Sequence, residues 1–212
     1  MTTKSILRPD LFRVVDEETE SVCYGFNQIW YKTRWQRLSG CGPSVVSGII
    51  CYLNRARPGA GPYGFMLTKR ECRILMEEVW KYVTPTLRGI PSTEILCKGA
   101  WAYIKAKGLD LSLDSVDVAE DRSKRPGFPG VLAFIGEALS RDTPVAFLNL
   151  SNGGEKRLDP WHWVTIISLS FEEDASSAVA EIIDDGRIKK IDLALWFQTT
   201  TLGGGFVSFN RL

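Results

Sequence analysis

The sequence lacks the features that mark several large classes of protein. It has one histidine and no C-x-x-C pair, so it cannot build a usual zinc site, and we expect no metal and no other cofactor. A formal net charge of +1 gives no electrostatic reason to expect nucleic acid as a partner. The longest apolar runs are far too short to span a bilayer, and the N-terminus has no apolar stretch of the signal-peptide kind. These absences predict a metal-free, cytoplasmic protein with no membrane span.

Cysteines are also too few for a disulfide framework. The five of them are scattered along the 212 residues, at positions 23, 41, 51, 72 and 97. Hydrophobic residues make up 44% of the chain and charged residues 24%, as in ordinary globular proteins. The length suits one domain with a substantial core. We therefore expect reduced thiols in a single domain over residues 1–212, whose oligomeric state the sequence leaves open.

The first two thirds of the chain have the pattern of helices. Apolar residues recur at helical spacing in four segments, at about 43–53, 68–82, 92–108 and 131–142. Thr68 and Glu71 have the spacing of a capping box at the start of the second segment. The prolines and glycines of Pro58–Pro62 are expected to close the first helix. Residues 114 to 130 are polar and contain two prolines, so we expect a loop there.

After Asp142 the sequence pattern changes from one typical of helices to one typical of strands. Runs rich in β-branched and aromatic residues, separated by glycine and polar turns, predict strands at 144–150, 162–171, 178–184 and 204–212. A short helical segment is expected around 193–197, and residues 187–190 are expected to form a solvated hairpin face. The chain thus has an α+β layout, with a helical part at about 41–141 followed by a mostly antiparallel sheet at about 142–212.

Cys41 lies in a sequence context that suits a thiol nucleophile. It stands between Gly40 and Gly42, just before Pro43 and the first helical segment. The amides and positive dipole end of a helix N-terminus favour a thiolate, which is the reactive form of cysteine. The glycines are expected to leave room for a substrate carbonyl. The alternative is a packed core thiol, because cysteine is among the residues most often buried.

The stretches around Cys41 and His162 carry a family resemblance. "GCGPSVVSGIICYL" resembles the nucleophile helix of papain-like cysteine peptidases, in particular the bacterial double-glycine leader peptidases, and "WHWVTI" resembles the histidine strand of that branch. His162 follows Cys41 by 121 residues, which is the papain order, and the helical half followed by a sheet half is that of the papain-like fold. The resemblance implies a Cys41–His162 catalytic pair.

The same resemblance implies an oxyanion-hole glutamine before the cysteine. Gln36 lies five positions upstream, where the usual spacing is six, and Gln28 lies farther away. A donor aimed at a developing oxyanion is worth about 3 kcal/mol in acyl transfer. We favour Gln36 for this role because it lies nearer the usual spacing, with Gln28 as the other option, and Gln36 is equally compatible with a surface amide in a loop.

A third residue of this family accepts a hydrogen bond from the second nitrogen of the histidine. The expected strand at 178–184 ends near Asp184 and Asp185, which period-2 alternation places on opposite faces. We favour Asp184, because Asp185 next to a glycine has the context of a solvated turn residue. Glu181 is a further candidate. The gap of 22 residues between His162 and Asp184 is longer than usual for the family.

Two classes of function follow from these features. The first is a thiol hydrolase or acyl-transfer enzyme, most simply a cysteine peptidase that cleaves a peptide or amide bond, with Cys41 as the nucleophile and His162 as the base and then the acid. The second is a catalytically silent papain-like domain that binds a peptide or protein. No motif in the sequence identifies the substrate.

Overall fold

The computed structural model describes residues 1–57 and 66–212 of the chain. Its α-helices are α1 (Arg34–Ser39), α2 (Cys41–Arg55), α3 (Lys69–Trp80), α4 (Thr93–Lys107), α5 (Phe128–Ser140) and α6 (Leu193–Thr199), with short 3-10 turns η1 (Pro9–Phe12), η2 (Gln28–Trp30) and η3 (Arg122–Lys124). Its strands are β1 (Thr2–Ser5), β2 (Arg13–Val15), β3 (Val22–Tyr24), β4 (Leu67–Thr68), β5 (Leu111–Val118), β6 (Val145–Asn149), β7 (His162–Phe171), β8 (Ala178–Asp184), β9 (Arg187–Asp192) and β10 (Gly204–Arg211). No helix in this part of the chain is long and apolar enough to cross a membrane.

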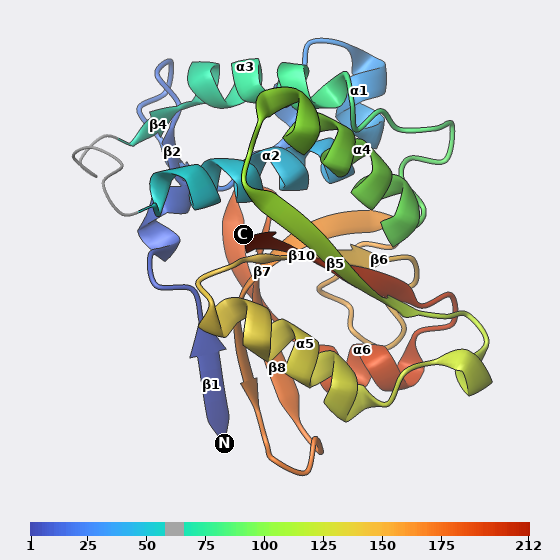
Figure 1. Cartoon of the computed structure of the whole chain (residues 1–212). Helices are drawn as coiled ribbons and strands as arrows, with labels where there is room; N and C mark the ends of the chain where they lie inside the picture. Colours follow the sequence, from blue (N-terminus) through green and yellow to red (C-terminus); the bar gives the residue numbers. More distant parts are fainter. Residues whose placement is uncertain (58–65) are drawn as a thin grey trace.

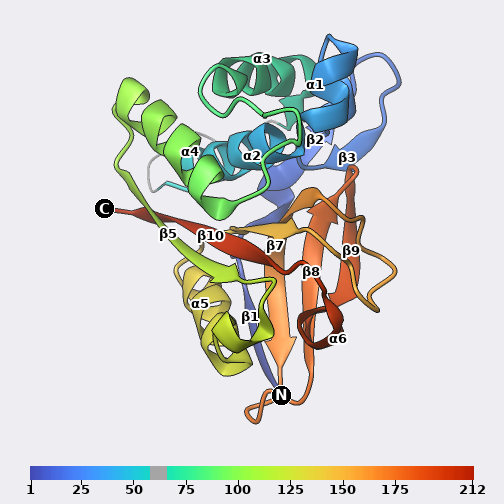
Figure 2. The ribbon, with the colours of Figure 1, turned by 90° about the vertical axis from the view of Figure 1, so that its right-hand side faces the viewer.

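The larger sheet joins strands from both ends of the sequence. Its order is β5-β10-β6-β7-β8-β9, and β1 pairs with the second half of β7, beyond the end of β6. All of these pairs are antiparallel. A small second sheet has the order β3-β2-β4. Figures 1 and 2 show α1 to α4 gathered on one side of the molecule and the large sheet with α5 and α6 on the other. The fold is therefore a mixed α/β arrangement with a mostly antiparallel sheet.

Several helix ends follow signals that the sequence carries. Thr68 and Glu71 exchange the two hydrogen bonds of a capping box at the start of α3, as predicted. Ser92 caps α4, and Gly108 ends this helix in the left-handed conformation that glycine adopts without strain. The predicted helical segment near residue 193 is confirmed as α6.

The division into a helical half and a later sheet half needs two corrections. Residues 111–118, partly expected to be loop, form the edge strand β5, which pairs with β10 along its whole length. Its apolar residues change phase between Leu113 and Val116, and this interrupts the alternation that identifies a strand. Residues 2–5 form β1 and join the same sheet. The large sheet thus takes strands from before, within and after the helical segment.

Helix α2 connects the helical side of the molecule to the sheet. Its apolar residues are buried as predicted from their spacing, namely Val45, Val46, Ile49, Ile50 and Leu53. It packs against α3 and against β7. The helix ends at Arg55, and the segment Pro58–Pro62, expected to close it, lies outside the described residues. Because α2 packs on β7, its first residue comes close to the start of that strand.

Candidate active site

Cys41 is the first residue of α2 and is partly buried between its two glycines. A Cβ atom on Gly40 would lie 2.6 Å from a ring carbon of Tyr31, and one on Gly42 would lie 2.8 Å from Cδ1 of Ile90. Side chains of the protein itself thus occupy the space beside the two glycines, and the expectation that the glycines make room for a substrate carbonyl stays a prediction. The glycines allow the start of α2 to pack tightly at a fixed position.

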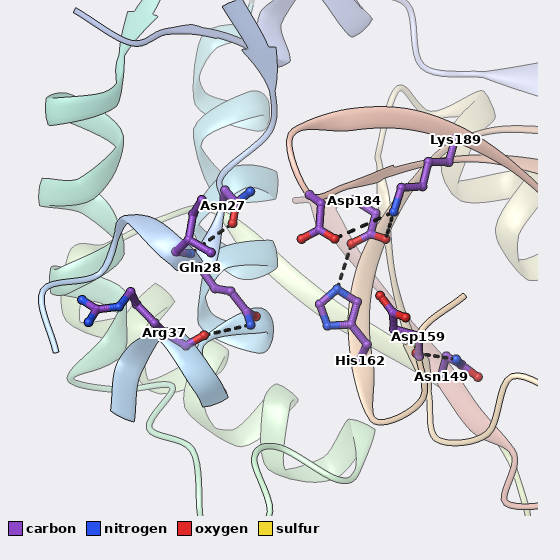
Figure 3. Close-up of polar contacts among 10 residues, drawn as sticks. Asn27, Gln28, Arg37, Asn149, Asp159, His162, Asp184 and Lys189 are labelled. Carbon is purple, nitrogen blue, oxygen red and sulfur yellow. Dashed lines mark hydrogen bonds and ion pairs between the residues drawn. The ribbon is translucent and has the colours of Figure 1, made fainter. Parts of the chain in front are cut away.

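His162 is the first residue of β7 and lies opposite Asn149 of β6. The buried Asn149 amide donates a hydrogen bond of 2.7 Å to the carbonyl oxygen of Asp159, which holds the loop that leads into β7 (Figure 3). The buried Trp163 indole donates one of 2.8 Å to the carbonyl oxygen of Ile90. Ile90 also packs against the start of α2, so it joins the cysteine and histidine segments.

Asp184, the last residue of β8, lies against the imidazole. Its Oδ1 accepts a hydrogen bond of 2.8 Å from Nε2 of His162 (Figure 3), and its side chain is only 2% exposed. Asp185 begins the following turn at a φ of 48° with an exposed side chain, and Glu181 instead forms an ion pair on the surface. The structure therefore places Asp184, and neither alternative, beside His162.

Lys189 is a charged neighbour that the sequence analysis missed. Its Nζ lies 2.7 Å from Oδ2 of Asp184, the oxygen that does not face the imidazole (Figure 3). The sequence held a signal for this contact: Asp185-Gly186 is a typical two-residue hairpin turn, and it pairs Asp184 with Arg187. Counting along the pairing of β8 with β9 puts Lys189 on the same face of the sheet as Asp184. The sequence analysis predicts only a solvated hairpin face for residues 187–190.

The charges of the site stabilise one another. Burial disfavours a charged imidazole, but the hydrogen bonds and negative charges of Asp184 and Cys41 outweigh it and raise the pKa of His162 to about 10. Burial also disfavours the Asp184 carboxylate, yet His162 and Lys189 hold its pKa below the ordinary value. Desolvation of Lys189 is likewise outweighed by the carboxylates beside it, which raise its pKa. At neutral pH the site thus favours an imidazolium hydrogen-bonded to a carboxylate.

A small cleft of about 30 Å³ opens between the start of α2, the start of β7 and the end of β8. Cys41, His162 and Asp184 all line it. Gln28 lies at the start of η2, on the wall that faces His162 and Asp184 (Figure 3), and its Nε2 donates a hydrogen bond of 2.9 Å to the carbonyl oxygen of Arg37. The buried Oε1 of Gln28 has no hydrogen-bond partner among the described residues.

Gln36 is placed differently from what the sequence suggested. Its Oε1 accepts hydrogen bonds from Thr33 in the capping box of α1, and its Nε2 donates one of 2.8 Å to Glu77. Each end of the amide is therefore engaged within the helical side of the molecule, and Gln36 is absent from the lining of the cleft. Of the two glutamines, the structure thus places Gln28, and not Gln36, in the lining of the cleft.

Three carboxylates near the cleft have the donor chemistry of a cation site. Oxygens of Asp159, Asp184 and Asp185 lie within 4.8 Å of one another. The Lys189 ammonium lies 2.7 Å and 3.9 Å from the last two of them. This lysine supplies the positive charge that such a group of acids needs.

Comparisons with known proteins add a likeness at the level of structure. No family model matches the chain, and no curated protein matches it. Among solved structures, UfSP from C. elegans, a ufmylation-specific cysteine protease with a papain-like fold, is similar to the whole of this chain with a TM-score of 0.55 and 10% sequence identity. The likeness is one of fold. The chain spans about a third of UfSP, 34% of its length.

Proposed function

We propose that the chain is a papain-like cysteine peptidase in which Cys41 is the nucleophile, His162 the general base and acid, and Asp184 the residue that orients the imidazole. The observation that carries the proposal is the 2.8 Å hydrogen bond from His162 to buried Asp184, in a cleft that Cys41 also lines. The papain-like fold of a known cysteine protease supports it. The kinship with double-glycine leader peptidases and the single-domain organisation remain predictions.

The reaction follows from the positions of these groups. The Cys41 thiolate attacks the carbonyl carbon of a peptide or amide, and the carbonyl π electrons move to the oxygen. His162, as an imidazolium, gives its proton to the leaving amine when the C–N bond breaks, which leaves an acyl-enzyme. His162 then takes a proton from water as the water attacks the thioester, and the acid leaves with the thiolate restored. An amine in place of water would give acyl transfer.

Two donors are placed for the developing oxyanion. The amide of Cys41 lies at the start of α2, where the first N–H groups of a helix have no partner within the helix. Gln28 Nε2 has two hydrogens and uses one for the carbonyl oxygen of Arg37, so the second is available to a substrate in the cleft. We assign the oxyanion hole to Cys41 and Gln28.

This assignment predicts different outcomes for the two glutamines. Gln28→Ala is expected to lower kcat about a hundredfold, as loss of one oxyanion donor does, with little change in KM. Gln36→Ala should keep kcat but lower the free energy of unfolding by about 1–2 kcal/mol, because it removes a capping box and the bond to Glu77. Urea unfolding and steady-state kinetics on both variants measure the two effects. The reverse pattern would return the role to Gln36.

The proposed function is tested most directly by the reactivity of the thiol. We expect iodoacetamide to alkylate Cys41 rapidly down to about pH 5, because the imidazolium beside the sulfur stabilises the reactive thiolate. His162→Ala should remove this acid reactivity. Peptide mapping by mass spectrometry identifies the modified cysteine. An unchanged rate in His162→Ala, rising only above about pH 8, would exclude the pair and leave a papain-like domain that binds without cleaving.

A further inference from the structure

Lys189 approaches the proposed site from β9 in a defined geometry. Its ammonium lies 2.7 Å from Oδ2 of Asp184, while Oδ1 of the same carboxylate faces His162. Each oxygen of Asp184 therefore has its own cationic partner. The next residue, Lys190, extends from the opposite face of the strand and pairs with Glu181 at 3.5 Å. Lys190 can therefore serve as the control for Lys189, because it is the next residue but does not contact Asp184.

The backbone fixes this contact. The Asp185-Gly186 turn has two residues with positive φ, 48° and 76°, which sets the pairing of β8 with β9. Lys189 is paired with Ile182, so its side chain is on the Asp184 face and reaches the carboxylate diagonally. The Lys189 side chain is 30% exposed, so it is only partly withdrawn from water.

Asp184 needs a permanent cation because of where it lies. A carboxylate that is almost fully buried tends to take up a proton, and His162 supplies a positive charge only while the imidazole is protonated. During catalysis the imidazole gives its proton away, and at that moment Lys189 is the cation left beside Asp184. The other charged groups that face the pair are the carboxylates of Asp159 and Asp185, and the Cys41 sulfur beyond the imidazole.

We propose that Lys189 is a positioning residue, which keeps Asp184 ionised with Oδ1 on His162 and so sets the acid limit of the active pH range. The proposal rests on the proposed function of the Cys41–His162 pair. Loss of the cation raises the pKa of the Asp184 carboxyl, so Asp184 takes up a proton at a higher pH and the acid limit moves to higher pH with it.

The first measurement uses the fact that His162 is the only histidine of the chain. In the Cys41→Ser protein, the NMR chemical shift of the His162 imidazole is followed from pH 3 to pH 8. The inflection of this curve at acid pH reports the protonation of Asp184. Adding Asp184→Asn should remove the inflection, which assigns it to that carboxyl group. Lys189→Gln is expected to move the inflection up by about one pH unit, and Lys189→Arg and Lys190→Gln to leave it in place. Lys189→Met repeats the test should the glutamine variant fold poorly.

The second measurement is the pH profile of Cys41 alkylation in the chain with its cysteine intact. Lys189→Gln should move the acid limb of the profile to higher pH by about one unit, which slows alkylation about tenfold below about pH 4, several-fold near pH 5, and leaves it nearly unchanged near pH 8. Lys189→Arg keeps the positive charge and should therefore show the same acid limb of the alkylation profile as the unaltered chain. An NMR inflection that stays in place in Lys189→Gln overturns the role of Lys189 whatever the thiol does. An unreactive thiol with a shifted inflection overturns instead the proposed peptidase function.

Discussion

Replacing Cys41 by alanine is expected to abolish acylation of the protein. With a p-nitrophenyl ester, the unaltered chain should release a burst of about one nitrophenol per molecule, because the thioester forms faster than water removes it. Without the sulfur no acyl-enzyme can form, and the rate should fall about ten-thousandfold, close to that of buffer. Stopped-flow absorbance measures both the burst and the slow phase that follows.

Cys97 provides the matched control for this variant. It is also partly buried, but it lies on α4 outside the cleft, and burial raises its pKa to about 11. Cys97→Ala should keep the burst in full. A burst of equal size in Cys41→Ala would assign the reaction to another group.

Asp184→Asn is expected to reduce kcat/KM about a thousandfold, although many papain-like enzymes use asparagine at this position. The reason is Lys189, which has only donors to offer and competes for the one oxygen of the new amide. When Lys189 takes that oxygen, the amide nitrogen faces Nε2 of His162. The imidazole is then held in the tautomer that cannot take a proton from Cys41.

This explanation predicts a partial rescue. Adding Lys189→Met to Asp184→Asn removes the competing donor, so the double variant should be about tenfold more active than Asp184→Asn alone. Asp185→Asn is the matched control: Asp185 is exposed in a turn with positive φ, where asparagine is equally suitable, so the rate should stay within about twofold. A double variant weaker than Asp184→Asn would contradict the tautomer explanation.

The parts of the fold that the sequence predicted are those whose signals are local. The strands β7 and β8 begin and end as expected, because their apolar runs are bounded by turn residues. The strand β1 could not be predicted in this way, since its residues Thr2–Ser5 are polar and the strand depends on pairing with β7. The same holds for β5, whose pairing with β10 joins residues about a hundred positions apart in sequence.

In the candidate site, too, the residues with local signals could be predicted and those that depend on distant parts of the chain could not. Cys41 and His162 stand in recognisable local contexts, and alternation along one strand together with the glycine that follows Asp185 was enough to favour Asp184 over Asp185. The choice between Gln36 and Gln28 was made by counting residues back from the cysteine, but the path of the chain between η2 and α2 decides which amide reaches the cleft. The number of residues between a glutamine and Cys41 does not determine this path.

The proposed nucleophile and its base lie on opposite sides of the molecule's main division, with α2 on the helical side and β7 in the sheet. During synthesis, at about 5–20 residues per second, the ribosome adds His162 roughly 6–24 seconds after Cys41. Throughout that interval the thiol has no imidazole beside it and reacts as an ordinary cysteine. If the pair acts as proposed, the growing chain thus cannot cleave peptides before residue 162 has been added.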